Sequence, residues 1–192
     1  MLQGQLISLT PAALCDRGDI YNWCFHSETT KSHAGPPEYP DIQIPTFEEF
    51  FESYEDYYFT GEAPEKGRGF LILHNGAPVG FISYASFHTK PHIAELDLWM
   101  NAEANCGRGF GTDALCTLST YLADTLGMQK AVIRPSRKNL RAVRSYEKAG
   151  FVDSPAEPDV YLRAEYVPIY GGGDYGTEDS ALLIKPLTTQ ES

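Results

Sequence analysis

The chain has few basic residues and lacks the common metal-binding and nucleotide-binding motifs. Its 15 Lys and Arg stand against 26 Asp and Glu, which gives a net charge of −11. Such a chain repels polyanions, so no nucleic-acid partner is expected. The four cysteines lack the close paired spacing of a zinc site, and no metal site is expected. The Gly-Lys-Ser/Thr sequence of a phosphate-binding Walker loop is also absent.

Long apolar runs are absent as well. No stretch approaches 18 continuous apolar residues, so no membrane partner is expected. No Lys or Arg precedes Arg17, which argues against a secretion signal, and the thiols are interpreted as reduced. A cytoplasmic protein is therefore expected. A length of 192 residues fits one domain spanning residues 1–192.

The most informative segment runs from Asn105 to Cys116 and places glycines at 107, 109 and 111, directly before an expected helix. Glycine tolerates positive φ and lets the backbone approach a ligand closely. The first N–H groups of a helix lack internal acceptors and bind anions well. The segment predicts a phosphate-binding loop, although glycine-rich turns also occur for packing alone.

The periodicity of the remaining chain predicts an α/β (α+β) fold with one mixed, mostly antiparallel sheet of six to seven strands and helices on both faces. Expected strands lie at residues 5–9, 69–74, 79–87, 92–100 and 130–134, then from 151 and at 180–187. Expected helices run from 11 towards 25, after the Thr46 capping box, across the leucines at 115–126 and over 139–149. Residues 27–45 are expected to form a long loop.

Two carboxylates occupy neighbouring positions on one face of the strand at 92–100. Glu95 and Asp97 alternate with Trp99, because successive side chains of a strand point to opposite faces. An unpaired carboxylate is costly to bury in a core. The pair therefore suggests a general base, with ion pairing to nearby Arg or Lys as the alternative.

Two motifs together resemble the GCN5-related N-acetyltransferase (GNAT) superfamily. They are the loop from Cys106 to Gly111 and the segment from Asn139 to Phe151, which contains Tyr-Glu-Lys-Ala-Gly-Phe. Within the superfamily, the second segment and the placement of Asp97 ten residues before Gly107 look most like aminoglycoside 6′-N-acetyltransferases. The resemblance implies acetyl-CoA as cosubstrate and direct transfer to an amine in a ternary complex.

The resemblance also assigns roles to individual residues. Asp97 is the first candidate for the general base and Glu95 the second, and Tyr146 is the general acid for the departing sulfur. The implied coenzyme-binding residues are Trp99, Met100, Cys106, Gly107, Arg108, Gly109, Phe110, Gly111, Thr112, Asn139 and Tyr146. A backbone N–H near Met100 would polarise the thioester carbonyl.

One residue departs from the family pattern. Cys106 stands where Gln or Arg is usual, so a side-chain contact to the pyrophosphate is lost. Backbone amides and Arg108 would then carry more of the coenzyme affinity. We interpret Cys106 as a small filler rather than a catalytic thiol, because no His is placed to activate it.

The expected acceptor is the primary amine of a small, cationic molecule, similar to an aminoglycoside or a polyamine. An acidic chain suits such a substrate. The alternatives are acetylation of a protein N-terminus or lysine, and a non-catalytic acyl-CoA-binding domain. The sequence leaves the oligomeric state open, a homodimer included.

Overall fold

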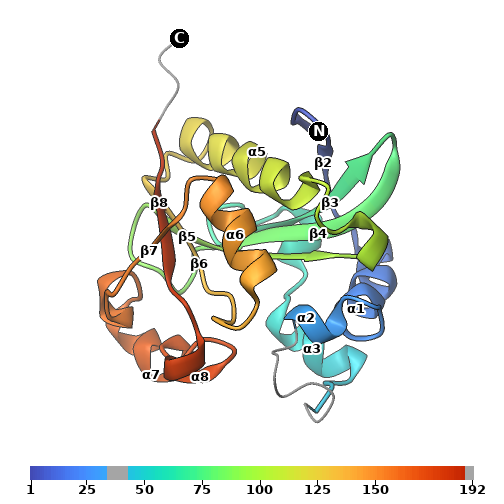
Figure 1. Cartoon of the computed structure of the whole chain (residues 1–192). Helices are drawn as coiled ribbons and strands as arrows, with labels where there is room; N and C mark the ends of the chain where they lie inside the picture. The colour runs from blue at the N-terminus through green and yellow to red at the C-terminus, as the bar shows by residue number, and fades with distance from the viewer. Residues whose placement is uncertain (34–42, 189–192) are drawn as a thin grey trace.

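The computed structural model describes residues 1–33 and 43–188. Within them the chain forms one mixed sheet in the order β1-β2-β3-β4-β5-β6-β8-β7 (Figure 1). All neighbouring strands are antiparallel except β5 and β6. The strands are β1 (Leu2–Gln3), β2 (Ser8–Pro11), β3 (Gly67–His74), β4 (Ala77–Ala85), β5 (Ile93–Met100), β6 (Lys130–Ile133), β7 (Val152–Asp153) and β8 (Leu183–Pro186).

This sheet confirms the mixed, mostly antiparallel class but has eight strands instead of six to seven. The additional strand is β1, which contributes only two residues and pairs Leu2 with Leu9. Two residues are too few to show any alternation in the sequence. The predicted hairpin at Asn75-Gly76 joins β3 to β4, and both residues have positive φ, 51° and 79°, as a tight hairpin turn requires.

Helices cover both faces of the sheet, as predicted (Figure 1). On one face α5 (Phe110–Asp124) and α6 (Leu140–Lys148) pack on the main core. The predicted leucines of α5 at 115, 118 and 122 are fully buried there. On the opposite face α1 (Arg17–Phe25), α3 (Phe47–Ser53) and α4 (Tyr57–Thr60) build an aromatic core. The Thr46 capping box starts α3 as expected, with Glu49 as its partner.

The N-terminal helix begins later than predicted. Thr10 and Pro11 pair with β3, so Pro11 ends a strand and does not start a helix. Proline is tolerated there because β1 pairs only with Ser8 and Leu9, so no strand of the described residues pairs with the outer edge at Pro11. A 3₁₀ turn follows at Leu14–Asp16, and α1 then starts at Arg17.

Two further segments differ from expectation. The expected loop at 27–45 contains the short helix α2 (Thr30–His33), and its residues 34–42 lie outside the described residues. The expected strand at 180–187 is limited to β8, and Ser180 makes only an isolated bridge to Ser136. The chain before residue 180 forms compact turns. These are the 3₁₀ turns Pro158–Val160 and Ala164–Tyr166 and the helices α7 (Val167–Tyr170) and α8 (Gly176–Asp179). None of the helices in residues 1–33 and 43–188 is long and apolar enough to cross a bilayer.

The parallel pair β5 and β6 separates halfway along β5. Their pairing runs from Ile93 with Lys130 to Leu96 with Ile133, and then it stops. Strand β5 continues to Met100 and remains paired with β4. Within the described part of the chain, the edge of β5 beyond Leu96 therefore has no neighbouring strand. This gap is the feature around which the candidate site is built.

Candidate active site

A cavity of about 470 Å³ opens beside the free edge of β5. Its walls come from the end of β5, the glycine loop (residues 105–111), α6 and α2. The glycine loop follows β5 and leads into α5, as the sequence predicted. Of the implied coenzyme-binding residues, those lining the cavity are Trp99, Met100, Cys106, Gly107, Gly109, Gly111, Thr112, Asn139 and Tyr146.

The glycine loop has the backbone geometry that its sequence predicted. Gly107 and Gly109 have φ of 71° and 85°, in the left-handed region that favours glycine. Gly109 is the N-cap of the 15-residue helix α5 and has no side chain to accept the helix's first N–H groups. The first backbone bond of the helix is donated by Asp113 to the Gly109 carbonyl. The preceding amides are thus oriented as donors for an external anion.

Two implied coenzyme contacts are absent from the cavity wall. The Arg108 guanidinium lies 4.8 Å from the centre of the Phe110 ring, and neither residue lines the cavity. The Phe110 side chain is buried in the main core. Phe110 can therefore contribute only its backbone amide to an anion bound at the loop. The basic residues that line the cavity are instead Arg141, Arg144 and Lys148, all on α6.

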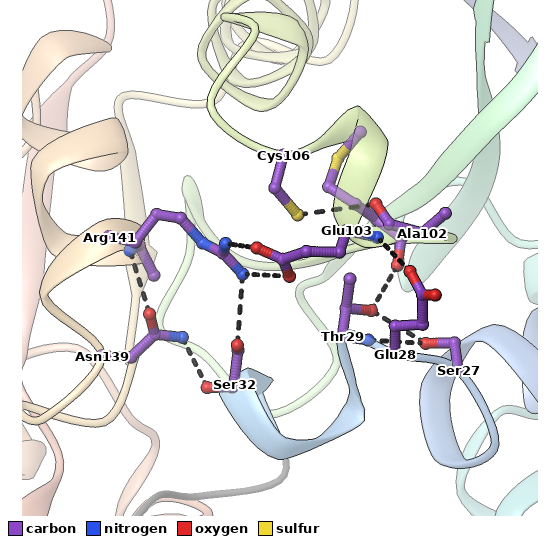
Figure 2. Close-up of polar contacts among 11 residues, drawn as sticks. Ser27, Glu28, Thr29, Ser32, Ala102, Glu103, Cys106, Asn139 and Arg141 are labelled. Atoms are coloured by element: carbon purple, nitrogen blue, oxygen red, sulfur yellow. Dashed lines mark hydrogen bonds and ion pairs between the residues drawn. The ribbon is translucent and has the colours of Figure 1, made fainter.

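Polar contacts hold α2 and the residues just before it at one wall of the cavity (Figure 2). The Thr29 hydroxyl donates to the Met100 carbonyl at 2.7 Å. The Asn139 side chain caps α6 by accepting from Ala142, and its amide also donates to the Ser32 carbonyl at 2.6 Å. Three segments far apart in the sequence therefore meet at one wall of the cavity.

Arg141 joins the same wall. Its guanidinium pairs with Glu103 and donates to the Ser32 hydroxyl at 3.1 Å (Figure 2). The hydrogen bond from Arg141 lowers the pKa of Glu103. A bound phosphate at this wall would share Arg141 with Glu103, because the guanidinium has five donors.

The amide of Met100 faces the gap between β5 and β6. The next amide along the chain, that of Asn101, donates to Val79 at the end of β4. Because successive N–H groups of a strand alternate in direction, the N–H and C=O of Met100 point away from β4. The Met100 carbonyl already accepts a hydrogen bond from the Thr29 hydroxyl. The Met100 N–H is therefore directed into the gap.

Cys106 lines the cavity as a half-buried thiol, 3.7 Å from the Ala102 carbonyl. Burial raises its pKa, and the nearby Arg141 only partly offsets this effect. A thiol with a raised pKa is a poor nucleophile at neutral pH. The interpretation of Cys106 as a filler rather than a nucleophile therefore stays our prediction.

Glu95, Asp97 and Trp99 lie on the same face of β5, opposite the face covered by α5 and α6, as the alternation predicted. Trp99 packs among aromatic side chains of α3 and β4, so its backbone, rather than its ring, is suited to the coenzyme. Asp97 is reached by solvent but is surrounded by protein atoms. Tyr54 donates to one of its oxygens at 2.9 Å and the Leu98 amide to the other at 2.8 Å.

The two carboxylates of β5 have opposite electrostatic environments. Desolvation and the negative charge of Asp174 raise the pKa of Asp97 to about 6, against the opposing effect of the Tyr54 hydrogen bond. Burial would also raise the pKa of Glu95, but hydrogen bonds and charge from His88 and Arg134 outweigh it and lower that pKa. Glu95 thus has the ion pairing that the sequence left as the alternative. Asp97 is the better placed of the two to take up a proton.

Tyr146 approaches the gap from the other face of the sheet. It lies on α6, is buried, and lines the cavity. Burial and then the negative charge of Asp97 raise its pKa, which keeps the phenol protonated. Because β5 and β6 are separated here, a donor on one face and an acceptor on the other can serve one reacting centre.

Two residues of this region were not found from the sequence. Tyr54 ends α3 among several aromatic residues, and nothing in their spacing along the sequence distinguishes the hydroxyl that reaches Asp97. Asp174 follows the Gly171–Gly173 turn and has no sequence pattern linking it to β5. It is reached by solvent yet largely enclosed by protein, and desolvation followed by the charge of Glu95 raises its pKa. Among residues 1–33 and 43–188, no group of three or more His, Cys, Asp or Glu could hold a metal ion.

Comparison with known proteins agrees with this arrangement. Residues 7–152 match the model of the acetyltransferase (GNAT) domain family. An aminoglycoside N(6′)-acetyltransferase type 1 from Klebsiella pneumoniae is 27% identical over 162 residues, which cover 77% of each chain.

Two solved structures share the fold over nearly the whole chain. The aminoglycoside acetyltransferase AAC(6′)-Ib, in complex with coenzyme A and kanamycin, has a TM-score of 0.66 at 19% identity, with 94% of each chain covered. The spermidine N-acetyltransferase from Vibrio cholerae, in complex with coenzyme A and spermine, has a TM-score of 0.64 at 18% identity, with 95% of this chain and 96% of the other covered. The chain belongs to the GNAT acetyltransferase family and is an N-acetyltransferase.

Proposed function

We propose that this enzyme transfers the acetyl group of acetyl-CoA to a primary amine of a small cationic acceptor, with Asp97 as general base and Tyr146 as general acid. The observation that carries the proposal is the gap between β5 and β6. Asp97 has a raised pKa and lies on β5 directly after the last paired residue, outside the lining of the cavity, and the neutral phenol of Tyr146 lines the cavity from the other face of the sheet.

The cavity suits acetyl-CoA both at its pyrophosphate and at its thioester. The amides of the glycine loop face the site expected for the pyrophosphate, and the residues Arg141, Arg144 and Lys148 supply positive charge in an otherwise acidic chain. The free edge of β5 offers backbone groups to the pantetheine arm. The Met100 amide is the proposed donor to the thioester carbonyl as negative charge develops on its oxygen.

The reaction follows from these positions. Asp97 accepts a proton from the acceptor ammonium, directly or through water, and the neutral nitrogen attacks the thioester carbon. A C–N bond forms, the C–S bond breaks, and Tyr146 donates its proton to the departing sulfur. The nitrogen loses its second proton as the amide forms, and this proton restores the Tyr146 phenol through water. A base whose pKa lies near 6 is largely ionised at neutral pH and still accepts a proton readily.

The acidic surroundings favour an acceptor with more than one positive charge. Asp174 is close enough to raise the pKa of Asp97, and this electrostatic cost is relieved when a cation binds beside the two carboxylates. Both carboxylates are reached by solvent, so a substrate can contact them. Aminoglycosides and polyamines are acceptors of this kind.

The direct test is a thiol-release assay with acetyl-CoA and a panel of aminoglycosides, polyamines, amino acids and peptides. We expect release of coenzyme A with one or more polycationic amines and formation of the N-acetyl product. Turnover with peptides alone would show that the acceptor is a protein and not a small molecule. Binding of acetyl-CoA without any transfer would contradict the proposed reaction.

Asp174→Asn should weaken acceptor binding. Loss of one carboxylate in a partly solvated site should raise KM for a polycationic amine about 5- to 10-fold, because such exposed charge pairs are screened. It should also shift the acidic limb of the pH profile below 6, since the charge that raises the pKa of Asp97 is gone. Steady-state kinetics with a polyamine and with a monoamine would check this. Equal effects on both acceptors would show that Asp174 does not recognise a second charge.

A further inference from the structure

Glu95, the second strand carboxylate, is fully engaged by two partners. His88 lies 2.6 Å from one carboxylate oxygen through Nε2, and Arg134 donates from Nε to the other at 2.5 Å. All three side chains are largely shielded, with 6%, 14% and 11% exposure for His88, Glu95 and Arg134. Breaking a shielded ion pair leaves a charge without its partner, which is costly. Glu95 therefore determines where the Arg134 guanidinium lies.

The other side of that guanidinium holds the segment that carries Asp174. Arg134 donates to the carbonyl of Tyr170, the last residue of α7. It also lies against Gly173, where an added Cβ would be 3.3 Å from Arg134 Nη1. The turn between them is closed by the Gly173 amide, which donates to the Tyr170 carbonyl at 3.1 Å. The guanidinium thus contacts both ends of the turn that precedes Asp174.

We propose that Glu95 is a positioning residue that acts through Arg134. By fixing the guanidinium it holds the Tyr170–Gly173 turn and keeps Asp174 beside Asp97, where the two carboxylates bind the acceptor's positive charges. This role deepens the proposed function and depends on Asp97 and Asp174 acting as described there. Glu95 itself does not contact the substrate.

Two conservative substitutions separate this role from a general loss of structure. Glu95→Gln keeps the shape and the hydrogen-bonding capacity but removes the charge that fixes Arg134, and His88 can adapt by changing tautomer. Arg134→Lys keeps the charge, but one ammonium group cannot span the Glu95 carboxylate and the Tyr170 carbonyl as a guanidinium does. Both variants should therefore release the turn. Asp56→Asn, which breaks the Arg17–Asp56 ion pair on the surface, is the matched control.

The first measurement is hydrogen–deuterium exchange of the free protein, which needs no turnover. We expect the amides of Gly171 and Gly173, which bond to Val167 and Tyr170, to exchange at least tenfold faster in Glu95→Gln and Arg134→Lys than in the wild type. Exchange in β3 and β4, and in Asp56→Asn throughout, should be unchanged. Unchanged exchange in this turn would overturn the proposal, whether or not an acceptor has been found.

The second measurement is a double-mutant cycle with Asp174→Asn in the kinetic assay. Glu95→Gln should raise the acceptor KM about 5- to 10-fold, as Asp174→Asn does, and change kcat less than threefold. The double variant should be no worse than Asp174→Asn alone, because both act through the same carboxylate. Multiplied effects, or a loss of kcat with unchanged KM, would overturn the proposal. Inactivity of the wild type on every amine would reject the proposed function instead. Hydrogen–deuterium exchange would then still test whether Glu95 holds the Tyr170–Gly173 turn through Arg134.

Discussion

Asp97→Asn should lower kcat/KM for the amine acceptor by about 10²- to 10⁴-fold, the range typical for removal of a general base. The amide has nearly the same shape as the carboxylate. Its oxygen can still accept from the Leu98 amide, and its NH2 can donate to the Tyr54 oxygen, whose proton can turn to Ser83, so the geometry of the site should be kept. What is lost is the group that takes the proton from the attacking nitrogen. Steady-state rates of thiol release at saturating acetyl-CoA would measure the effect.

The pH dependence should identify the base. Since the pKa of Asp97 is about 6, wild-type kcat/KM should fall as the pH drops through that value and the carboxylate becomes protonated. Asp97→Asn should lack this limb. Asp19→Asn, a change of the same chemistry on the exposed surface of α1, should have the wild-type profile. A variant of Asp97 with the wild-type rate and limb would remove the assignment.

Loss of activity in Asp97→Asn should not come with loss of stability. A carboxyl whose folded pKa is raised destabilises the folded state when ionised. The cost is absent below the unfolded pKa, grows as the pH rises towards 6, and is complete above it. Solvent screens this exposed side chain, so we expect a gain of only about 1 kcal/mol in unfolding free energy at pH 7.5, and about half of that at pH 5. Thermal unfolding at the two pH values would test whether the variant remains folded.

Tyr146→Phe should reduce kcat by about 10²-fold while changing KM for acetyl-CoA less than threefold. The phenol is kept protonated by burial and by the charge of Asp97, so at neutral pH it has a proton to give to the leaving sulfur. Removing the hydroxyl leaves the ring, which fills the same space in the core beside α5. Turnover at saturating concentrations of both substrates would measure the loss.

The control for Tyr146 is Tyr121→Phe on α5. Its ring packs near Phe70 and Tyr84, away from the cavity, and its hydroxyl should not matter for transfer. We expect the wild-type kcat for this variant. If Tyr146→Phe also retained the wild-type kcat, the proton for the sulfur would have to come from elsewhere, and water would be the first alternative.

Much of the fold could be predicted from the sequence because the signals are local. The Asn75-Gly76 turn, the Thr46 capping box and the leucine stripe of α5 each depend on residues a few positions apart, and the structure confirms all three. The start of the first helix was wrong because Pro11 fits either a helix start or the end of a strand. Only its pairing with Phe70 on β3 decides between the two.

The candidate site likewise has parts that local sequence signals predict and parts that they do not. The sequence by itself determined the glycine loop before α5 and the shared face of Glu95 and Asp97, since backbone freedom and strand alternation are properties of neighbouring residues. Only the tertiary structure decided that the two carboxylates differ. Glu95 meets Arg134, which directly follows the neighbouring strand β6, and Asp97 meets the charge of Asp174, 77 positions further along the chain. Electrostatic environments depend on distances in space, and no spacing along the sequence encodes them.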